Sequence, residues 1–350
     1  MRITSITTMK DEAPFILEWV AYHRLIGVND LIVFSNDCTD GTDMMLERLD
    51  DMGLVRHYTN PSVYTERTKH HLQVIRYVNT FSRLKKADWI VSLDVDEFIC
   101  VNAGQGRLED LFNAAPDTNV WSMSQLNFGH GGVWDYTDDL LGEQFNYCWH
   151  KTDPCHPNVN KRGTKTLTHR SSNPAEIHNH SPVFRKKDVG NVVMRGGSGQ
   201  LVTDVDLTKD VKSLTAPRFG FDLVQLNHYA LRSVESFLLK RVRGNANHDT
   251  AGYGMQYWRR YDQNDWFDDS IARWMPQVRA MRDELLQDPE LNTLHTGAVA
   301  NAKTRIAELK QMEGAQPLLN SIHRFNKRNP GIIPRYQAAD AASTSANGGH

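Results

Sequence analysis

Short runs of apolar residues alternate with helical patterns along the first hundred residues. Apolar and β-branched residues predict buried strands at 2–9, 31–34, 54–58 and 89–93. Apolar positions spaced three and four residues apart predict helices between them, at about 14–27, 43–52 and 66–84. This alternation is typical of a mostly parallel sheet flanked by helices. The sequence therefore predicts an α/β fold.

The fourth predicted strand leads directly into a cluster of acidic residues. Residues 89–93 are followed by Asp94, Asp96 and Glu97, three acids within four positions. Carboxylates at the end of a buried strand repel one another unless a cation lies between them. Open α/β sheets bind ligands at the carboxyl ends of their strands, and carboxylate oxygens suit Mg²⁺ or Mn²⁺. We therefore predict a metal and phosphate site here, although a solvated acidic turn would give the same pattern.

The rest of the chain falls into parts with different patterns. Residues 134–217 show little periodicity, and we interpret them as an irregular acceptor-binding or lid region. Residues 223–229 predict another strand, and a helix capped by Ser233 follows. The predicted α/β domain thus spans residues 1–245. We expect a helical C-terminal extension at 246–335 and a disordered tail at 336–350.

Composition and charge limit the classes of partner. The 350-residue chain carries 40 Lys and Arg against 42 Asp and Glu, which gives no electrostatic reason to expect nucleic acid. No apolar run approaches the roughly 18–20 residues of a membrane span, and the N-terminus lacks the apolar segment of a signal peptide. We expect a cytoplasmic protein. The basic residues of 321–335 are compatible with a peripheral contact with the cytosolic face of a membrane. A solvated terminal segment explains these residues more simply.

Several motifs together resemble one family. The opening KDEAPFILEWVAYHRLIGVNDLIVFSNDCTDGT is similar to that of the GT-A glycosyltransferases of family 2, and most similar to the branch shared with family 92. The acidic segment DVDEF follows at a suitable distance. Later segments fit as well: Phe128, Gly129 and Gly131, residues 165–180, and Asn227, His228 and Tyr229 followed by Ser233, Glu235, Phe237 and Lys240. The resemblance covers about residues 2–245 and implies a GT-A (Rossmann-like) fold.

The resemblance also implies a reaction. GT-A enzymes transfer a sugar from a nucleotide-diphosphate sugar, here most simply a UDP-sugar, to a glycan or glycolipid acceptor, and the family favours inversion. Mn²⁺ or Mg²⁺ bridges the two phosphates and neutralises the leaving diphosphate. Asp96 would bind the metal directly, Asp94 would bind the ribose or the metal's water, and Glu97 would orient the pair. A C-terminal histidine, His228 or else His180, would complete the metal site.

The remaining candidate residues are assigned less specifically. Residues after the first two strands would line the nucleoside pocket: Asp11, Glu12, Asn36, Asp37 and Asp40. Arg67 and Lys69 could face the diphosphate, although a solvated helix face explains them equally well. Inversion requires a carboxylate that acts as a base and deprotonates the attacking hydroxyl. Asp135, Glu176 and Asp222 are alternatives for this role that the sequence does not separate.

Three other functions share parts of this pattern. A catalytically silent protein that binds nucleotide sugars would have the same fold, and only turnover separates it from an enzyme. A sugar nucleotidyltransferase would need a Gly-rich segment with Arg and Lys after the first strand, which KDEAPF lacks. A phosphohydrolase of the haloacid dehalogenase type would need Thr or Val at the position of Phe98. A glycosyltransferase is therefore the leading hypothesis.

Overall fold

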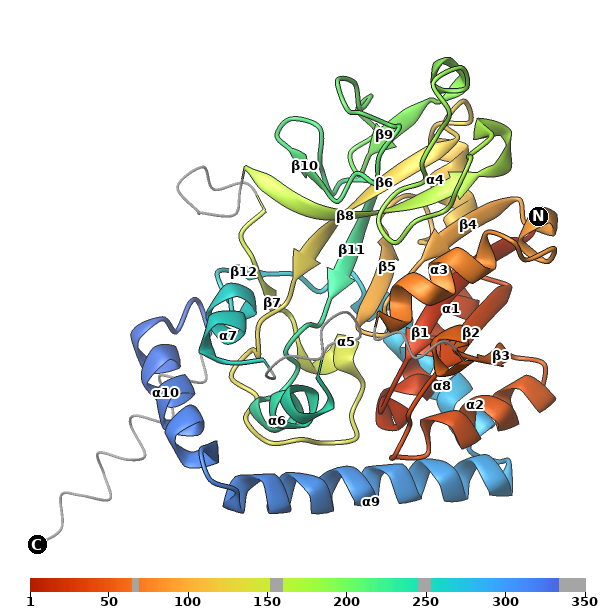
Figure 1. Ribbon diagram of the computed structural model, residues 1–350. Helices are drawn as coiled ribbons and strands as arrows, with labels where there is room; N and C mark the ends of the chain where they lie inside the picture. Colours follow the sequence, from red (N-terminus) through yellow and green to blue (C-terminus); the bar gives the residue numbers. More distant parts are fainter. Residues whose placement is uncertain (65–68, 152–159, 245–252, 334–350) are drawn as a thin grey trace, which may run out of the picture.

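The computed structural model describes residues 1–64, 69–151, 160–244 and 253–333. Within these residues a ten-stranded sheet forms the centre of the protein (Figure 1). Its strands are β1 (Ile3–Met9), β2 (Asp30–Ser35), β3 (Arg56–Thr59), β4 (Trp89–Ser92), β5 (Glu97–Val101), β6 (Val120–Asn127), β8 (Lys161–His169), β9 (Met194–Gly196), β10 (Ser213–Thr215) and β11 (Val224–His228). Their order is β3-β2-β1-β4-β8-β6-β11-β5, with β10 paired to β8 and β9 to β6.

Helices cover the sheet and continue beyond it. They are α1 (Ile16–Ile26), α2 (Thr42–Asp51), α3 (His70–Val78), α4 (Leu108–Ala114), α5 (Leu141–Gln144), α6 (Val234–Arg243), α7 (Met255–Tyr261), α8 (Met275–Leu285), α9 (Pro289–Gln311) and α10 (Ala315–Arg328). Short 3₁₀ helices are η1 (Ala13–Phe15), η2 (Pro61–Tyr64), η3 (Leu84–Lys86), η4 (Arg170–Ser172), η5 (Val189–Asn191) and η6 (Ala272–Trp274). Two short strands, β7 (Tyr147–Cys148) and β12 (Trp266–Phe267), form a separate antiparallel pair. The predicted α/β architecture with C-terminal helices is confirmed.

The first four strands form the parallel half of the sheet. β1 pairs in parallel with both β2 and β4, and β2 pairs in parallel with β3. All residues of β2 and β4 are buried, which explains why these strands are continuous apolar runs in the sequence. Because parallel strands end at the same edge, the loops after β1, β2 and β4 lie next to one another.

The other half of the sheet is mixed and contains a strand that sequence analysis missed. β8 lies between β4 and β6 and runs antiparallel to both. It falls inside residues 134–217, so the prediction of an irregular stretch is wrong for residues 161–169. Several of its buried residues are polar and find polar partners in the sheet; Thr164, for example, lies 2.5 Å from the hydroxyl of Ser122. A buried strand of this composition shows no apolar pattern.

The C-terminal helices pack against the helices of the sheet domain. α8 contacts α1, and α9 extends from η1 and α2 to α6 along one side of the protein (Figure 1). α10 contacts α7 and α9, and an apolar cluster joins Phe237 of α6, Trp258 of α7 and Ile322 of α10. The C-terminal helices therefore hold α6 against α7 and α10. The predicted boundary at 245/246 and the predicted tail at 336–350 lie outside the described residues.

Candidate functional site

The acidic cluster lies where strands from both halves of the sheet meet. Asp94 and Asp96 occupy the turn between β4 and β5, and Glu97 is the first residue of β5. β11 pairs antiparallel with β5 so that His228 lies opposite Glu97, and β6 places Asn127 opposite His228. Strand register therefore brings the predicted histidine to the acids.

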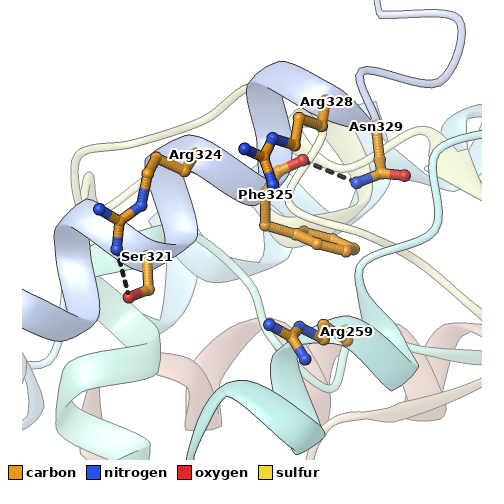
Figure 2. A pocket seen from close by; sticks show the side chains of 6 residues that line it. All are labelled: Arg259, Ser321, Arg324, Phe325, Arg328 and Asn329. Carbon is orange, nitrogen blue, oxygen red and sulfur yellow. Dashed lines mark hydrogen bonds between the residues drawn. The ribbon is translucent and has the colours of Figure 1, made fainter.

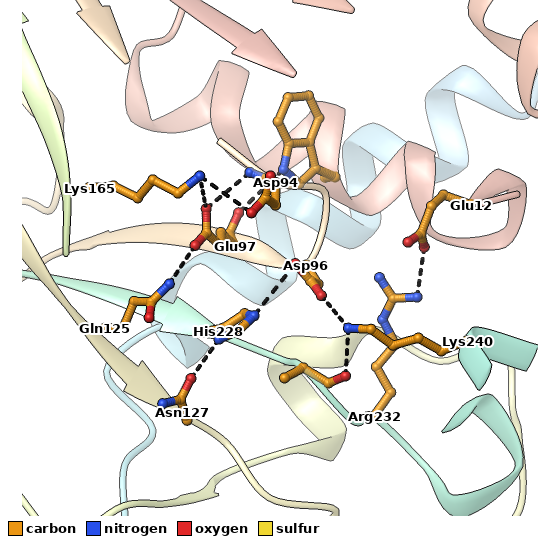
Figure 3. A network of polar contacts seen from close by, with 12 residues as sticks. Glu12, Asp94, Asp96, Glu97, Gln125, Asn127, Lys165, His228, Arg232 and Lys240 are labelled. Atoms are coloured by element: carbon orange, nitrogen blue, oxygen red, sulfur yellow. Dashed lines mark hydrogen bonds and ion pairs between the residues drawn. The ribbon is translucent and has the colours of Figure 1, made fainter. Parts of the chain in front are cut away.

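Asp96 and His228 face each other at the end of β11 (Figure 3). Oδ1 of Asp96 lies 3.7 Å from Nε2 of His228. On the other side of the ring, Nδ1 donates to Oδ1 of Asn127 at 2.5 Å, which leaves the lone pair of Nε2 directed at Asp96. Burial lowers the pKa of His228 to about 4, so the ring is neutral at physiological pH. A carboxylate oxygen and an imidazole lone pair thus face each other, in an arrangement that could hold a cation.

The second oxygen of Asp96 has a cationic partner. Nζ of Lys240, from α6, donates to Oδ2 of Asp96 at 2.7 Å and to the carbonyl of Ala230 at 2.7 Å. The rings of Tyr253 and Tyr257 lie 5.6 and 5.4 Å from the same ammonium. Although burial opposes ionisation, the positive charge of Lys240 holds the pKa of Asp96 well below its usual range. Asp96 is therefore a carboxylate at any physiological pH.

Asp94 and Glu97 share a different cation. Nζ of Lys165, from β8, lies 3.3 Å from Asp94 Oδ2 and 3.2 Å from Glu97 Oε2, and it donates to Asn179 Oδ1 at 2.7 Å. Glu97 is fully buried, and burial raises its pKa to about 7. Glu97 also accepts the backbone N–H of Asp94 at 3.0 Å and the amide of Gln125 at 2.8 Å. Glu97 thus supports the turn from inside, while the side chain of Asp94 is 43% exposed at the surface of the site.

The residues predicted for the nucleoside pocket lie in the loops after β1 and β2. Asp40 ties these loops together, because it accepts the N–H of Ala13 at 2.9 Å and that of Thr42 at 2.9 Å. Asp11 accepts the N–H of Thr39 at 2.6 Å. The contacts of Asp11 and Asp40 therefore hold the loops after β1 and β2 against each other.

The other residues predicted for this pocket differ in exposure. Asn36 is buried and accepts the amide of Asn60 at 3.1 Å, whereas Asp37 is exposed at the edge. Glu12 is buried in ion pairs with Arg232, at 2.8 Å, and Arg243. These loops and the acidic turn border the same edge of the sheet.

The three candidate bases do not lie in the polar network of the acids. Asp222 precedes β11, at the opposite end of that strand from His228, which is about 20 Å for six extended residues. Glu176 pairs with His178 at 3.0 Å, and its side chain is 60% exposed. Asp135 is exposed in the loop that meets the start of α6, where Trp134 accepts the N–H of Glu235.

The predicted basic residues and the second histidine lie elsewhere. Lys69 is exposed just before α3, and Arg67 lies outside the described residues. Nδ1 of His180 donates to the carbonyl of Thr164 at 3.0 Å, next to Lys165 on the Asp94 side of the site. His228, rather than His180, faces Asp96.

Sequence reasoning assigned no role to the residues that support the acids. Figure 3 shows five of them, Gln125, Asn127, Lys165, Arg232 and Lys240, and the other two are Asn179 and Arg243. Lys165 and Asn179 lie within residues 165–180, and Arg232 and Lys240 lie within the motif that begins at Asn227, so the family resemblance was the available signal for these four. The other three, Gln125, Asn127 and Arg243, lie outside the motifs that resemble the family.

The side chains fit a metal that arrives together with phosphate oxygens. In the part of the chain that the structure describes, no three His, Cys, Asp or Glu residues converge as a ready-made metal cage. Asp96 and His228 could offer two ligands, and Asp94 lies nearby at the surface. Mg²⁺ sites of this class use one or two carboxylates and complete the shell with substrate phosphates and water.

A second feature is a basic cavity of about 330 Å³ on the side of α7 and α10. Arg259 comes from α7, and Ser321, Arg324 and Arg328 come from α10 (Figure 2). Within the described residues, none of the three arginines forms an ion pair with a carboxylate. Such a site suits an anion. No helix among the described residues meets the length and apolarity that a membrane span requires.

Comparisons with known proteins point to one family. The model of glycosyltransferase family 92 matches residues 3–208. Glycosyltransferase family 92 proteins of Oryza sativa subsp. japonica and Ricinus communis are each 26% identical, over 129 and 132 residues. These matches cover 36% of this chain but only 21% and 23% of the relatives, so the chain spans less than a quarter of their length.

Similar solved structures have low sequence identity. Residues 1–349 of TarS from S. aureus align over 88% of this chain and 83% of that chain, with 11% identity and a TM-score of 0.30. Glucosyl-3-phosphoglycerate synthase from Mycobacterium tuberculosis covers 35% of this chain and 44% of that chain, with 17% identity and a TM-score of 0.23.

Proposed function

Because the chain belongs to glycosyltransferase family 92, we propose that it transfers a sugar from a nucleotide-diphosphate sugar to a glycan or glycolipid acceptor in a metal-dependent reaction. The observation that carries the proposal is the pairing of Asp96 with a neutral His228 at the carboxyl end of the sheet. A buried carboxylate beside an imidazole lone pair is a donor set for Mg²⁺ or Mn²⁺.

The residues divide into those that hold the metal and those that hold the donor. Asp96 and His228 would bind the cation, which supplies Lewis-acid stabilisation of the leaving diphosphate. Asp94 faces outward and is free to accept a hydrogen bond from a ribose hydroxyl or a water molecule. Glu97 holds the backbone of Asp94 in place. The loops containing Asp11 and Asp37 border the space for the nucleoside.

The acceptor side of the reaction is defined less closely. An inverting reaction needs a base that deprotonates the attacking hydroxyl. Asp222 lies at the far end of β11, so we propose Asp135 or Glu176 for this role. A direct comparison of Asp135→Asn and Glu176→Gln in transfer assays separates them.

Calorimetric titration of the whole chain with UDP tests the donor site. With Mn²⁺ present, we expect UDP to bind at least about tenfold more tightly than without it, because Asp96 and His228 would hold a cation that neutralises the charge of the diphosphate. A panel of UDP-sugars, assayed for release of UDP with Mn²⁺, then separates an enzyme from a silent binding protein. If the folded protein binds neither UDP, GDP, CMP nor dTDP, the proposed function is wrong.

We further propose that the basic cavity places the enzyme at an anionic membrane surface on the cytosolic face. Arg259, Arg324 and Arg328 surround one cavity without a described carboxylate partner, and guanidinium groups bind phosphate in a bidentate manner. The apolar face of α10 is buried against α6 and α7, through Leu318 and Ile322. The helix therefore offers the membrane its charges and does not insert.

Vesicle sedimentation tests this contact. We expect the protein to bind phosphatidylcholine vesicles only when they contain phosphatidylglycerol, and to dissociate at high salt. Arg324→Gln/Arg328→Gln should weaken binding about 30-fold, because each basic residue near an anionic surface contributes about 1 kcal/mol. Lys85→Gln/Lys86→Gln removes the same charge from two exposed residues elsewhere and should bind like the wild type. Equal binding by both double variants would exclude the cavity as the contact.

A further inference from the structure

A cluster of cations from one short segment surrounds Asp96 and Glu12. These cations have no part in the metal and donor site proposed above. Arg232, Lys240 and Arg243 lie within twelve residues of one another, at the start and along α6. Lys240 pairs with Asp96, while Arg232 and Arg243 both pair with Glu12. Three cations thus face two carboxylates, which leaves one surplus positive charge beside the metal ligand.

Arg232 is held in a costly conformation with unused donors. Its backbone has a φ of 60°, in the left-handed region that a residue with a side chain seldom adopts. The guanidinium lies 3.6 Å above the ring of Phe15, and one of its nitrogens donates to Glu12 at 2.8 Å. The buried Nε and Nη2 atoms have no hydrogen-bond partner in the described residues. Buried donors without an acceptor destabilise a protein, so the arrangement suits a ligand with several oxygens.

Lys240 contacts the same carboxylate that a metal would bind. An ammonium uses three donors, and two of those of Lys240 go to Asp96 and Ala230. A divalent cation on Asp96 would repel an ammonium that also contacts Asp96. Lysine has a flexible stem, so its charge can move a few ångströms to a new partner. A diphosphate bound to the same cation would provide one.

We infer that Lys240 and Arg232 bind the diphosphate of the sugar donor, and that Lys240 does so by leaving Asp96 when a divalent cation takes its place. This inference rests on the proposed function. Without nucleotide, the metal must displace Lys240 from Asp96. The ammonium then has no new partner to replace the lost ion pair, so the metal binds weakly. With nucleotide, the displaced ammonium pairs with phosphate oxygens. Metal and donor therefore strengthen each other's binding by the same factor.

Titration of the whole chain with Mn²⁺, followed by the electron paramagnetic resonance of free Mn²⁺, measures this factor with and without UDP. In the wild type, we expect UDP to strengthen Mn²⁺ binding by about 5–150-fold. In Lys240→Met, Mn²⁺ alone should bind more tightly and Mn²⁺ with UDP more weakly, so that the factor falls towards one. Lys240→Arg keeps the charge and should keep most of the coupling. Lys303→Met, on the exposed face of α9, is the matched control and should behave like the wild type.

The two directions of change separate this mechanism from a structural role. Lys240→Gln, which can still donate to the carbonyl of Ala230, provides a second variant if the Met variant folds poorly. Weaker binding of Mn²⁺ alone by both variants, or an unchanged coupling factor, would overturn the inference. If the wild type binds Mn²⁺ but no nucleotide, the proposed function fails. Tighter binding of Mn²⁺ alone by Lys240→Met would in that case still show that Lys240 competes for Asp96.

Discussion

Asp96→Asn will lower the rate of sugar transfer by about 10³-fold, which corresponds to about 4 kcal/mol of transition-state stabilisation. Asp96 is the one residue of the turn that contacts both the neutral imidazole of His228 and the ammonium of Lys240. Asn keeps the shape but has no charge to hold a divalent cation next to the diphosphate. Initial rates of UDP release at increasing Mn²⁺ concentration measure the effect.

The control for this variant is Asp222→Asn, the same chemical change at the exposed opposite end of β11. It should retain the wild-type rate, and thermal unfolding should show that both variants are folded. A rate for Asp96→Asn within tenfold of the wild type would show that this carboxylate does not hold the metal.

Lys165→Met will lower the free energy of unfolding by about 3–5 kcal/mol at neutral or higher pH, because it leaves the buried carboxylate of Glu97 without a counter-charge. Lys165 has an exposed fraction close to zero and lies between Asp94 and Glu97. Glu97 is fully buried, so its charge cannot be solvated when the ammonium is removed. Urea unfolding at several pH values measures the loss.

The pH dependence of this loss has a definite sign. Burial raises the folded-state pKa of Glu97 from 4.5 to about 7, so the folded protein binds more protons than the unfolded chain between these values. Stability from this group is therefore greatest at low pH and falls as pH rises through about 7. Removing Lys165 raises that pKa further, so the variant should lose less stability in mild acid than in mild base.

Two further variants identify the cause of the loss. Lys165→Met/Glu97→Gln removes the buried charge together with its partner and should recover most of the stability. Lys161→Met changes an exposed lysine at the start of the same strand and should unfold like the wild type. A loss for Lys165→Met that is equal at all pH values, and that the double variant does not reduce, would point to packing instead of charge.

The sequence predicted the parts of the protein that depend on local pattern. β1, β2 and β4 are buried throughout or nearly so, and their apolar runs were visible without a structure. The turn at Asp94 and Asp96 follows β4 directly, and the cap at Ser233 accepts the N–H of Ser236 at 3.1 Å as predicted. His228 was predicted as a candidate metal ligand because it ends an apolar run within a motif that resembles the family.

Only the tertiary structure decided which cations hold the acids. Lys165, Lys240 and Arg232 contact Asp94, Asp96 and Glu12 across 71, 144 and 220 residues of sequence. The basic residues chosen from the sequence for the diphosphate were Lys69, which is exposed just before α3, and Arg67, which lies outside the described residues.

The physical reason is that hydrophobic periodicity reports which face of an element is buried, but not which polar side chain it meets there. β8 shows this most clearly. Thr164, Lys165 and Thr166 are buried because their strand pairs with β4 on one side and β6 on the other. Nothing in the sequence of these three residues requires their burial. The acids and their strand were determined by the sequence alone, whereas their counter-charges, and with them the electrostatics of the site, were determined by the pairing of distant strands and helices.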